Sequence, residues 1–263
     1  MLLVNLMLPC KLLRTFSNNF TLTYLSEKYV LLIASGALLA VLVTVALLAS
    51  RLFTKQPYER RIYRYSLVIT NYAYLGYTLI EGVFGEAMLT DFTFFAIPFI
   101  IYTYTFGYAL LTGGKGLLKR LVNPSTVAIA LGMVLGLTGV QLPETVLGAI
   151  SSASACVGPL SMLLTGLTLS AYRPRELLFD PRIYIFSAVR LILIPAAVLA
   201  VCRIFPLDAV MPMMLIITCM PCGLNTIVFP RLINADTRIG ASLTLITHAI
   251  ALPTLMLWLS ILQ

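Results

Sequence analysis

Two stretches of the chain place amide side chains and glycine in the middle of long apolar runs. The first is Asn71-Tyr72-Ala73-Tyr74-Leu75-Gly76-Tyr77-Thr78, and the second is Met220-Pro221-Cys222-Gly223-Leu224-Asn225-Thr226. Such stretches are poor continuous helix, and unwound backbone at membrane depth is tolerated where it lines a buried or wet cavity. Interrupted helices at corresponding positions of two halves point to the substrate site in transporters. We therefore predict substrate binding by Asn71, Gly76, Pro221 and Asn225.

Taken singly, the same residues have a simpler interpretation. Asn71 and Asn225 could hydrogen-bond between packed helices, and Gly76 and Gly223 could allow two helices to approach closely. The occurrence of two matched interruptions favours the binding site over this alternative.

Arg190 and Glu81 are ionisable residues placed deep within apolar runs. A charge at such depth is costly and normally faces a cavity or a partner. Arg190 is therefore a candidate for attracting an anion, and Glu81 for coupling a proton to transport. The alternative for Arg190 is a structural pair with Glu81 or with the carbonyl groups at a helix end, and the sequence leaves these interpretations open.

The other reactive residue types have less specific interpretations. His248 is the only histidine and titrates near neutral pH, but a hydrogen-bonded packing role is favoured. Lys11 and Arg14 are expected to extend to the membrane interface. Cys219 and Cys222 form a CxxC pattern, yet inside an apolar run both are interpreted as small packing residues. No cofactor and no metal site is predicted.

The elements that position these residues must be membrane-spanning helices. Of the 263 residues, 60% are hydrophobic and 11% are charged, whereas soluble domains have about 45–50% and about 25%. Apolar runs bounded by charged or Pro/Gly clusters predict an all-α polytopic bundle without a separate soluble domain. The nine predicted spans are 2–17, 29–50, 65–85, 92–112, 124–141, 145–171, 183–203, 209–230 and 239–262.

The basic residues between the runs support this count. Four alternate gaps, 51–64, 113–122, 172–182 and 231–238, hold thirteen Lys and Arg residues, and the other four gaps hold two. Cytoplasmic loops carry such an excess, so we predict an integral protein of the cytoplasmic (inner) membrane with its C-terminus outside. The same placement explains the net charge of +8. No nucleic-acid partner is predicted, because no basic face or aromatic platform accompanies the charge.

Short motifs follow one another in a fixed order along nearly the whole chain. They are Asn71 with Gly76, Phe84-Gly85, Asn123-Pro124, Leu142-Pro143, Pro159-Leu160, Met220-Pro221 with Asn225, and Leu252-Pro253. In order and spacing they resemble the auxin efflux carrier family, and the compact chain resembles its bacterial branch.

The resemblance implies ten helices in two inverted five-helix repeats, with helices four and nine broken and crossed near the membrane centre. It implies organic anions as substrates: auxin in plants, and small carboxylates such as malonate or malate in the bacterial branch. Asn71 and the backbone around Gly76 match the first crossover, and Pro221 and Asn225 match the second. Thr78 stands where the family usually has the proline of the first crossover, which implies a softer break.

Met1 falls where the second helix of the family begins, so the first family helix is expected to be missing. Residues 1–113 would then form a first repeat of four helices and 114–263 a second repeat of five, within one membrane domain. A misassigned start, a truncated allele or a degraded gene would explain the loss.

The predicted function is that of a secondary transporter, a permease that moves small organic anions across the lipid bilayer by alternating access. A coupling ion, H+ or Na+, and a homodimer are left open. The chain is predicted not to be an enzyme, because intramembrane catalysis needs clustered ionisable residues such as HExxH. A non-transporting membrane subunit or an inactive truncated remnant is the remaining alternative.

Overall fold

The computed structural model describes residues 2–114 and 122–262, and nearly all of the described residues are helical. Helices dominate because backbone N–H and C=O groups in an apolar environment must find partners within their own segment. The predicted all-α class is confirmed. Lys115, Lys119 and Arg120, which the sequence places in a basic gap, lie outside the described residues.

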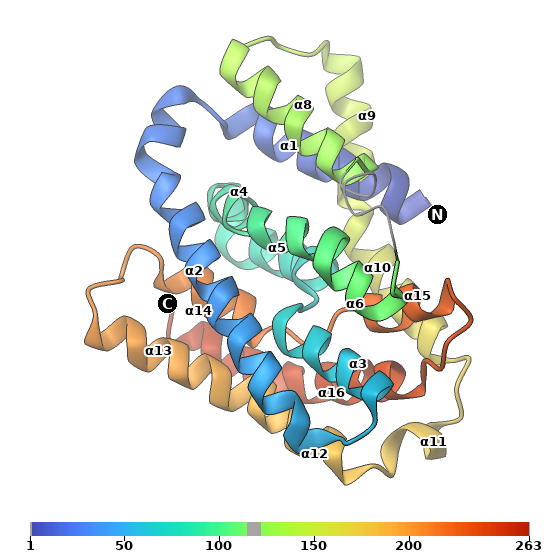
Figure 1. The fold of residues 1–263 in the computed structure, drawn as a ribbon. Coiled ribbons are helices and arrows are strands. Elements are labelled where there is room, and N and C mark those ends of the chain that lie inside the picture. Colours follow the sequence, from blue (N-terminus) through green and yellow to red (C-terminus); the bar gives the residue numbers. More distant parts are fainter. Residues whose placement is uncertain (1, 115–121, 263) are drawn as a thin grey trace.

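The first half of the chain consists of two helices followed by two interrupted rods (Figure 1). A π-helical turn, η1 (Leu3–Met7), leads into α1 (Leu8–Asn19), and α2 (Leu22–Phe53) follows. The first rod comprises α3 (Pro57–Val68), η2 (Tyr72–Gly76) and α4 (Tyr77–Phe95). The second comprises α5 (Ile97–Tyr102), η3 (Thr103–Gly107) and α6 (Tyr108–Thr112), bent by 47° from the segment Tyr72–Phe95.

The second half of the described chain also combines helices with interrupted rods. Its first elements are α8 (Pro124–Thr138), α9 (Glu144–Ala155), α10 (Val157–Leu169) and the short α11 (Pro174–Leu178). One rod then runs through α12 (Pro181–Ala188), η4 (Val189–Leu193) and α13 (Ile194–Ile204). The last elements are α14 (Met211–Cys219), α15 (Asn225–Arg231) and α16 (Arg238–Ser260).

Local sequence signals explain several helix boundaries. The Asn123 side chain accepts hydrogen bonds from the first backbone N–H groups of α8 and forms a capping box with Thr126, a preferred way to begin a helix. Asp180 caps α12 through the N–H of Arg182. Gly85 has a φ of 83° and interrupts α4, a conformation that costs glycine little. The fourth span was predicted to follow a gap at this point.

Each of the nine predicted spans coincides with one helix or with a rod of consecutive helices. Within the described residues, four segments are long and apolar enough to cross a membrane, namely Leu22–Phe53, Glu144–Leu169, Pro181–Ile204 and Arg238–Ser260. The bent pair Tyr72–Phe95 and Ile97–Thr112 makes up to five. The remaining predicted spans are shorter or broken, so the number nine stays a prediction.

Contacts between the loops agree with the predicted alternation of the spans. Three gaps that were assigned to one membrane side meet: Glu59 pairs with Arg182 at 3.0 Å, and the Tyr58 hydroxyl donates to the carbonyl of Asp236 at 2.8 Å. Two gaps assigned to the other side meet where Lys28 pairs with Asp91 at 2.7 Å. These contacts bring three of the predicted gaps together and, separately, two others.

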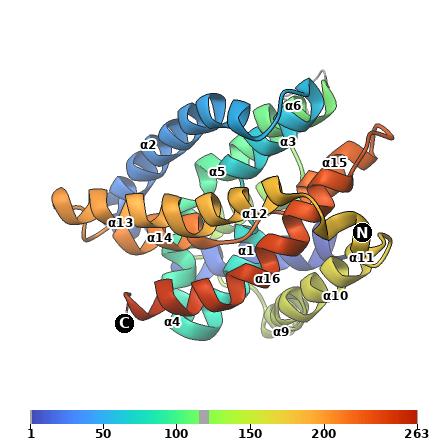
Figure 2. The same ribbon diagram turned by 90° about the horizontal axis from the view of Figure 1, so that it is seen from below.

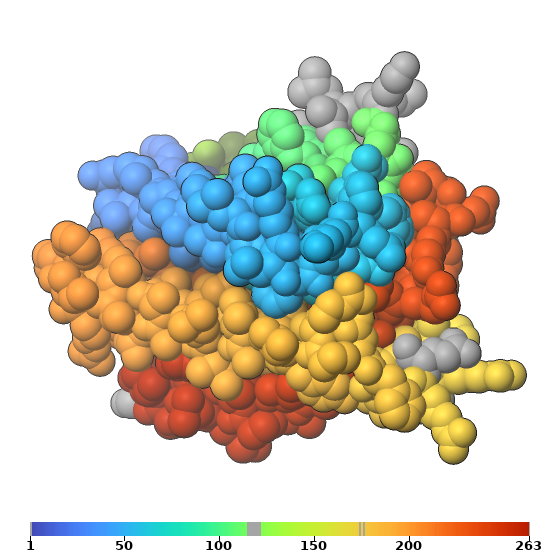
Figure 3. All heavy atoms as spheres, turned by 60° about the horizontal axis from the view of Figure 1, so that its bottom comes forward, coloured from blue at the N-terminus to red at the C-terminus, as the bar shows by residue number. Residues whose placement is uncertain are grey.

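The helices pack into two units. α1 packs mainly against α8 and α9, and these three helices lie together at the top of Figure 1. The other unit holds α2 to α6 and α12 to α16, whose interrupted rods meet in the middle (Figure 2). On one face of it α2 runs beside α12 and α13 (Figure 3). Large apolar side chains of this unit, such as Leu48 of α2 and Leu193 of η4, are exposed. Such a surface suits a lipid environment.

Candidate functional site at two crossed helix breaks

The first helix break lies at residues 69–71, slightly before the stretch that the sequence indicated. α3 ends at Val68, Ile69 is extended (φ −100°, ψ 129°), and a π-helical turn begins at Tyr72. Gly76 and Thr78 are helical, so neither residue forms the break. Gly76 donates its N–H to the Asn71 carbonyl at 3.1 Å and packs near the Phe92 ring. The break forms without a proline at position 78.

The second break lies where the sequence predicted it. α14 ends at Cys219, Met220 is extended (φ −69°, ψ 147°), and helix resumes at Asn225. Pro221 explains the interruption locally, because proline has no N–H to donate and disfavours helical conformation in the residue before it.

The two breaks cross and pair with each other through their backbones. The Asn71 N–H donates to the Pro221 carbonyl at 2.8 Å, and Thr70 forms an isolated antiparallel bridge with Cys222. The Cys222 N–H donates to Thr247 Oγ1 of α16 at 3.0 Å. Backbone groups freed by the breaks thus find partners, as buried polar groups must.

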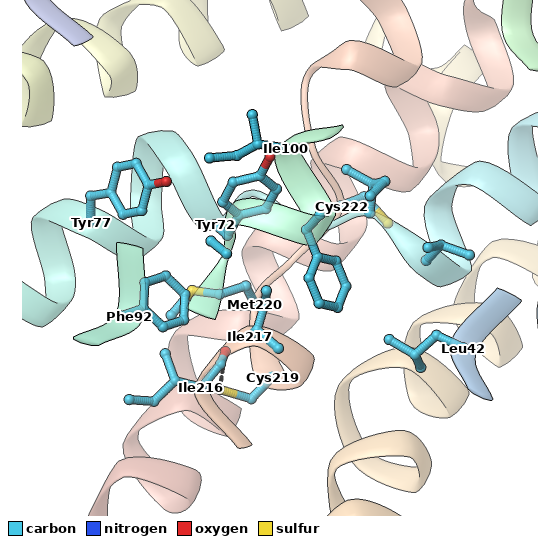
Figure 4. Close-up of a cluster of buried hydrophobic side chains, with 14 of the residues drawn as sticks. Leu42, Tyr72, Tyr77, Phe92, Ile100, Ile216, Ile217, Cys219, Met220 and Cys222 are labelled. Carbon is cyan, nitrogen blue, oxygen red and sulfur yellow. Dashed lines mark hydrogen bonds between the residues drawn. The ribbon is translucent and has the colours of Figure 1, made fainter. Parts of the chain in front are cut away.

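Apolar side chains from both breaks are packed into one buried cluster around this crossing. Tyr72 directly follows the first break, and Met220 and Cys222 belong to the second; Figure 4 shows them beside Phe92 and Ile217. The crossing is therefore held in place by a packed surrounding as well as by hydrogen bonds.

A small cavity lies at the crossing. Asn71 and Asn225, one from each break, both line it, together with residues of α1 and η3 such as Leu8 and Tyr104. Its volume of about 30 Å³ holds a water molecule or two. Pro221 and Gly76 do not line it. Leu8 and Tyr104 could not be recognised from the sequence, because both come from segments distant from the breaks.

The cavity wall carries polar atoms that lack partners. Asn71 is 2% exposed and Thr70 4%, and within the described residues Asn71 Oδ1 and Thr70 Oγ1 have no hydrogen-bond partner. A buried polar atom left in this way costs free energy. Both atoms lie beneath the accessible surface, so a ligand or water reaches them only if the cavity opens.

Arg190 is fully buried beside the end of α14, where the second break begins. Its Nη1 donates to the carbonyl of Thr218 near the end of α14 at 2.9 Å. Its Nε and Nη2 have no partner among the described residues. Of the two pairings that the sequence left open, the one with helix-end carbonyls is found and the one with Glu81 is wrong. The side chain therefore carries its charge into the interior without a carboxylate beside it.

Glu81 forms an ion pair with Lys11 of α1 instead. The Lys11 side chain is 3% exposed, so the prediction that it extends to the interface is wrong. Arg14 pairs with Glu86 at 3.5 Å and is partly buried. α1 brings both basic residues against α4, whose acidic residues offset the cost of burying charge.

His248 of α16 is hydrogen-bonded, as predicted, but one of its partners belongs to the first break. Its Nδ1 lies 2.7 Å from the carbonyl of Thr244, and its Nε2 lies 2.9 Å from Nδ2 of Asn71. The sequence offered no sign of this contact, because 177 residues separate the two side chains.

The cysteines form no disulfide; Cys219 and Cys222 are buried and free. Within the described residues, no group of His, Cys, Asp or Glu could hold a metal ion. Both cysteines belong to the packed cluster, which is the role that the sequence favoured.

A family model described as membrane transport protein matches residues 1–116 and 109–259. The chain belongs to this family. The family is that of the auxin efflux carriers, so the resemblance recognised in the motifs is confirmed. Membership places the chain among membrane transport proteins.

The chain resembles an uncharacterized transporter of Methanocaldococcus jannaschii. The two are 27% identical over 202 residues, which cover 73% of this chain and 65% of the relative. The chain thus spans slightly less than two thirds of the length of the curated relative it matches.

Proposed function

We propose that the transporter is a secondary permease that moves small organic anions, carboxylates in particular, by alternating access at the crossed breaks. It would act in the cytoplasmic (inner) membrane with its C-terminus outside. The observation that carries the proposal is that Asn71 and Asn225, from opposite halves of the chain, line one buried cavity. Amide N–H groups donate to carboxylate oxygens in charge-assisted hydrogen bonds.

Arg190 supports an anionic substrate. A buried guanidinium whose Nε and Nη2 have no partner among the described residues makes the region beside the second break electropositive, and low polarity strengthens this field. Arg190 does not line the cavity, so we assign it the attraction of the anion and not direct contact. Glu81 is neutralised by Lys11, and we assign this pair to structure and not to coupling.

The cavity of about 30 Å³ is too small for a carboxylate substrate. This conformation therefore corresponds to a closed state, and transport requires the site to open. The unit of α1, α8 and α9 touches the crossing through Leu8. Rocking of the two packing units against each other would open the cavity to one side and then to the other.

The element order supports two repeats, residues 1–113 and 114–263. In the second repeat the broken rod α14–α15 is followed by one more helix, α16, as the broken rod α3–α4 is followed by α5–α6 in the first. The crossing of two such rods suits inverted repeats around a central site. A homodimer stays a prediction.

Uptake into liposomes tests the proposal. The purified transporter is reconstituted and labelled malonate, malate, succinate and indole acetate are offered in turn. The double variant Asn71→Ala with Asn225→Ala should lose uptake of the transported anion. Asn18→Ala, which removes an exposed amide away from the cavity, is the matched control and should keep it.

Uptake that survives in the double variant would disprove the site. No uptake of any anion by the wild-type chain would favour the alternative, a non-transporting subunit or an inactive truncated remnant. Repeating the assay with the sequence upstream of Met1 included would separate an incomplete chain from a non-transporting one.

A further inference from the structure

The hydrogen bonds of His248 determine where its protons lie. Its Nδ1 faces the backbone carbonyl of Thr244 at 2.7 Å. Because a carbonyl oxygen only accepts hydrogen bonds, Nδ1 must carry a proton. A neutral ring then has no proton on Nε2, which becomes a lone-pair acceptor.

The neutral ring in turn orients the amide of Asn71. Its Nε2 lies 2.9 Å from Asn71 Nδ2, so the NH2 group of Asn71 donates to the histidine. The amide oxygen Oδ1 is left buried and without a partner among the described residues. In this state the acceptor oxygen has no accessible surface, and it would repel a carboxylate if the cavity opened towards it.

A second proton on His248 would reverse the arrangement. With Nε2 protonated, the ring donates at both nitrogens, and Asn71 must turn its amide so that Oδ1 accepts. The NH2 group then becomes free to donate to a ligand. The turn also gives Oδ1 the partner that it lacks.

We propose that His248 is the proton-binding group of the transporter and couples one proton to each anion through the amide of Asn71. The proposal rests on the proposed function, since it assumes that Asn71 meets the anion. The proton is taken from water on the side where the anion enters. It leaves Nε2 for water on the other side when the anion departs.

The buried positive charge of Arg190 near α16 favours joint binding of the proton and the anion. The elements packed against it are α3, α11, α12, η4, α14 and α15; α11 contributes Leu177 to this contact. The titratable or charged side chains that the other five elements carry are Tyr58, Glu59, Arg60, Arg61, Tyr63, Arg64, Tyr65, Arg182, Tyr184, Arg190, Cys219 and Arg231, and Cys222 lies in the break between α14 and α15. In the described part of the chain none of them hydrogen-bonds to the ring of His248.

Arg182 is paired with Glu59, whereas Arg190 donates to the Thr218 carbonyl and forms no ion pair among the described residues. A second cation buried in this region is unfavourable on its own. A bound carboxylate supplies the opposite charge, so the proton and the anion stabilise each other, and neither is retained well alone.

A nuclear magnetic resonance measurement can observe this directly, because the chain has one histidine. The transporter, carrying a tag without histidine, is labelled with 15N-histidine and its ring nitrogens are recorded at about pH 7. Without an anion, we expect a neutral ring protonated at Nδ1. Saturating malonate or malate, whichever the liposome assay shows to be transported, should produce a doubly protonated ring. A ring that stays neutral under saturation would overturn the proposal.

Binding measured against pH provides the second test. For the wild type, the affinity for the anion should fall about tenfold per pH unit above neutrality, as expected for one proton bound with each anion. His248→Gln should remove this slope, and His248→Asn is the substitute if the first variant does not fold. Asn225→Ala, which alters the cavity without touching the ring, should weaken binding at every pH and keep the slope.

The outcomes separate the two proposals. Absence of anion binding in the wild type at every pH would overturn the proposed function itself. Binding that does not depend on pH, or an equal slope in His248→Gln, would overturn the coupling role of His248 and leave the anion site intact.

Discussion

The backbone N–H of Asn71 donates to the carbonyl of Pro221 at 2.8 Å. This bond joins two helix interruptions that lie in different halves of the chain. It satisfies a donor that the first break frees and an acceptor that the second break frees, in a region that water does not fill. The crossing is therefore one structural unit, and a substitution in either break should disturb the backbone of the other.

Gly223 should tolerate no side chain. A Cβ at this position would lie 3.1 Å from the Thr70 carbonyl oxygen, and backbone cannot move aside cheaply. We expect Gly223→Ala to lower the free energy of unfolding by about 1–3 kcal/mol, as overpacking does, and to reduce transport. Thermal melting in detergent measures the first effect and liposome uptake the second.

Gly36 is the matched control for Gly223, because a Cβ there meets nothing within 4 Å. Gly36→Ala should melt at or slightly above the wild-type temperature. A Gly223→Ala variant as stable and active as Gly36→Ala would contradict the tight crossing.

The contact between α8 and α1 depends on two glycines spaced four residues apart, Gly132 and Gly136. A Cβ on Gly132 would lie 2.9 Å from the Leu13 carbonyl oxygen, and one on Gly136 would lie 2.7 Å from that of Phe16. Small residues at this spacing let two membrane helices approach closely. We expect Gly136→Leu to destabilise the transporter by about 1–3 kcal/mol or more, measured by melting. Gly148→Leu, at an open position, should have little effect.

The ion pair of Lys11 and Glu81 should respond asymmetrically to substitution. Lys11 is 3% exposed and Glu81 is 35% exposed, so Glu81→Gln leaves a buried cation unpaired while Lys11→Met leaves a carboxylate that water reaches. Breaking a buried pair costs roughly 3–5 kcal/mol, and the exposure of Glu81 places this pair at the lower end. We expect Glu81→Gln to be the more destabilising change.

The double variant Lys11→Met with Glu81→Gln completes a thermodynamic cycle for this pair. Its stability should exceed that of Glu81→Gln alone, because no unpaired charge remains. Additive effects of the two substitutions would show that the pair is not coupled.

Replacing Arg190 should reduce transport without reducing stability. Its burial without a carboxylate is unfavourable, so Arg190→Met should leave the melting temperature equal or higher. Anion uptake should fall by about tenfold or more, since the charge behind the crossing is lost; tenfold corresponds to about 1.4 kcal/mol. A stable variant with normal uptake would remove Arg190 from the mechanism.

Asp180 should contribute stability that depends on pH. Arg182 donates to it at 2.6 to 3.0 Å and holds the pKa of the carboxyl below its ordinary value of 3.8. A lowered pKa stabilises the fold above the ordinary value, and the contribution is lost as the pH falls through the folded value. Asp180→Asn should therefore melt earlier than the wild type at neutral pH. The difference should shrink below about pH 4; a constant difference would contradict the pairing.

Several features of the fold could be predicted because they depend on short segments alone. The free energy of transferring apolar runs into lipid identified the helices, and the basic gaps predicted which loops share an end of the molecule. The contacts of Glu59 with Arg182 and of Lys28 with Asp91 agree with that grouping. Pro221 located the second break through its own missing N–H.

The first break was placed a few residues too late because its cause is not local. Residues 69–71 contain neither proline nor glycine, and their extended backbone is stabilised by pairing with Pro221 and Cys222. Gly76 was predicted to lie in the break because glycine disfavours helix. It is helical instead, and it lies close to the Phe92 ring.

The partners of the buried polar side chains were decided by tertiary structure. Lys11 with Glu81, Arg190 with the Thr218 carbonyl, and His248 with Asn71 each join segments far apart in the chain. The sequence determined which segments are helical and apolar, because those properties follow from each segment's own residues and the surrounding lipid. It did not determine which polar groups meet, because that depends on how the helices cross, and the crossing is set by the packing of the whole bundle.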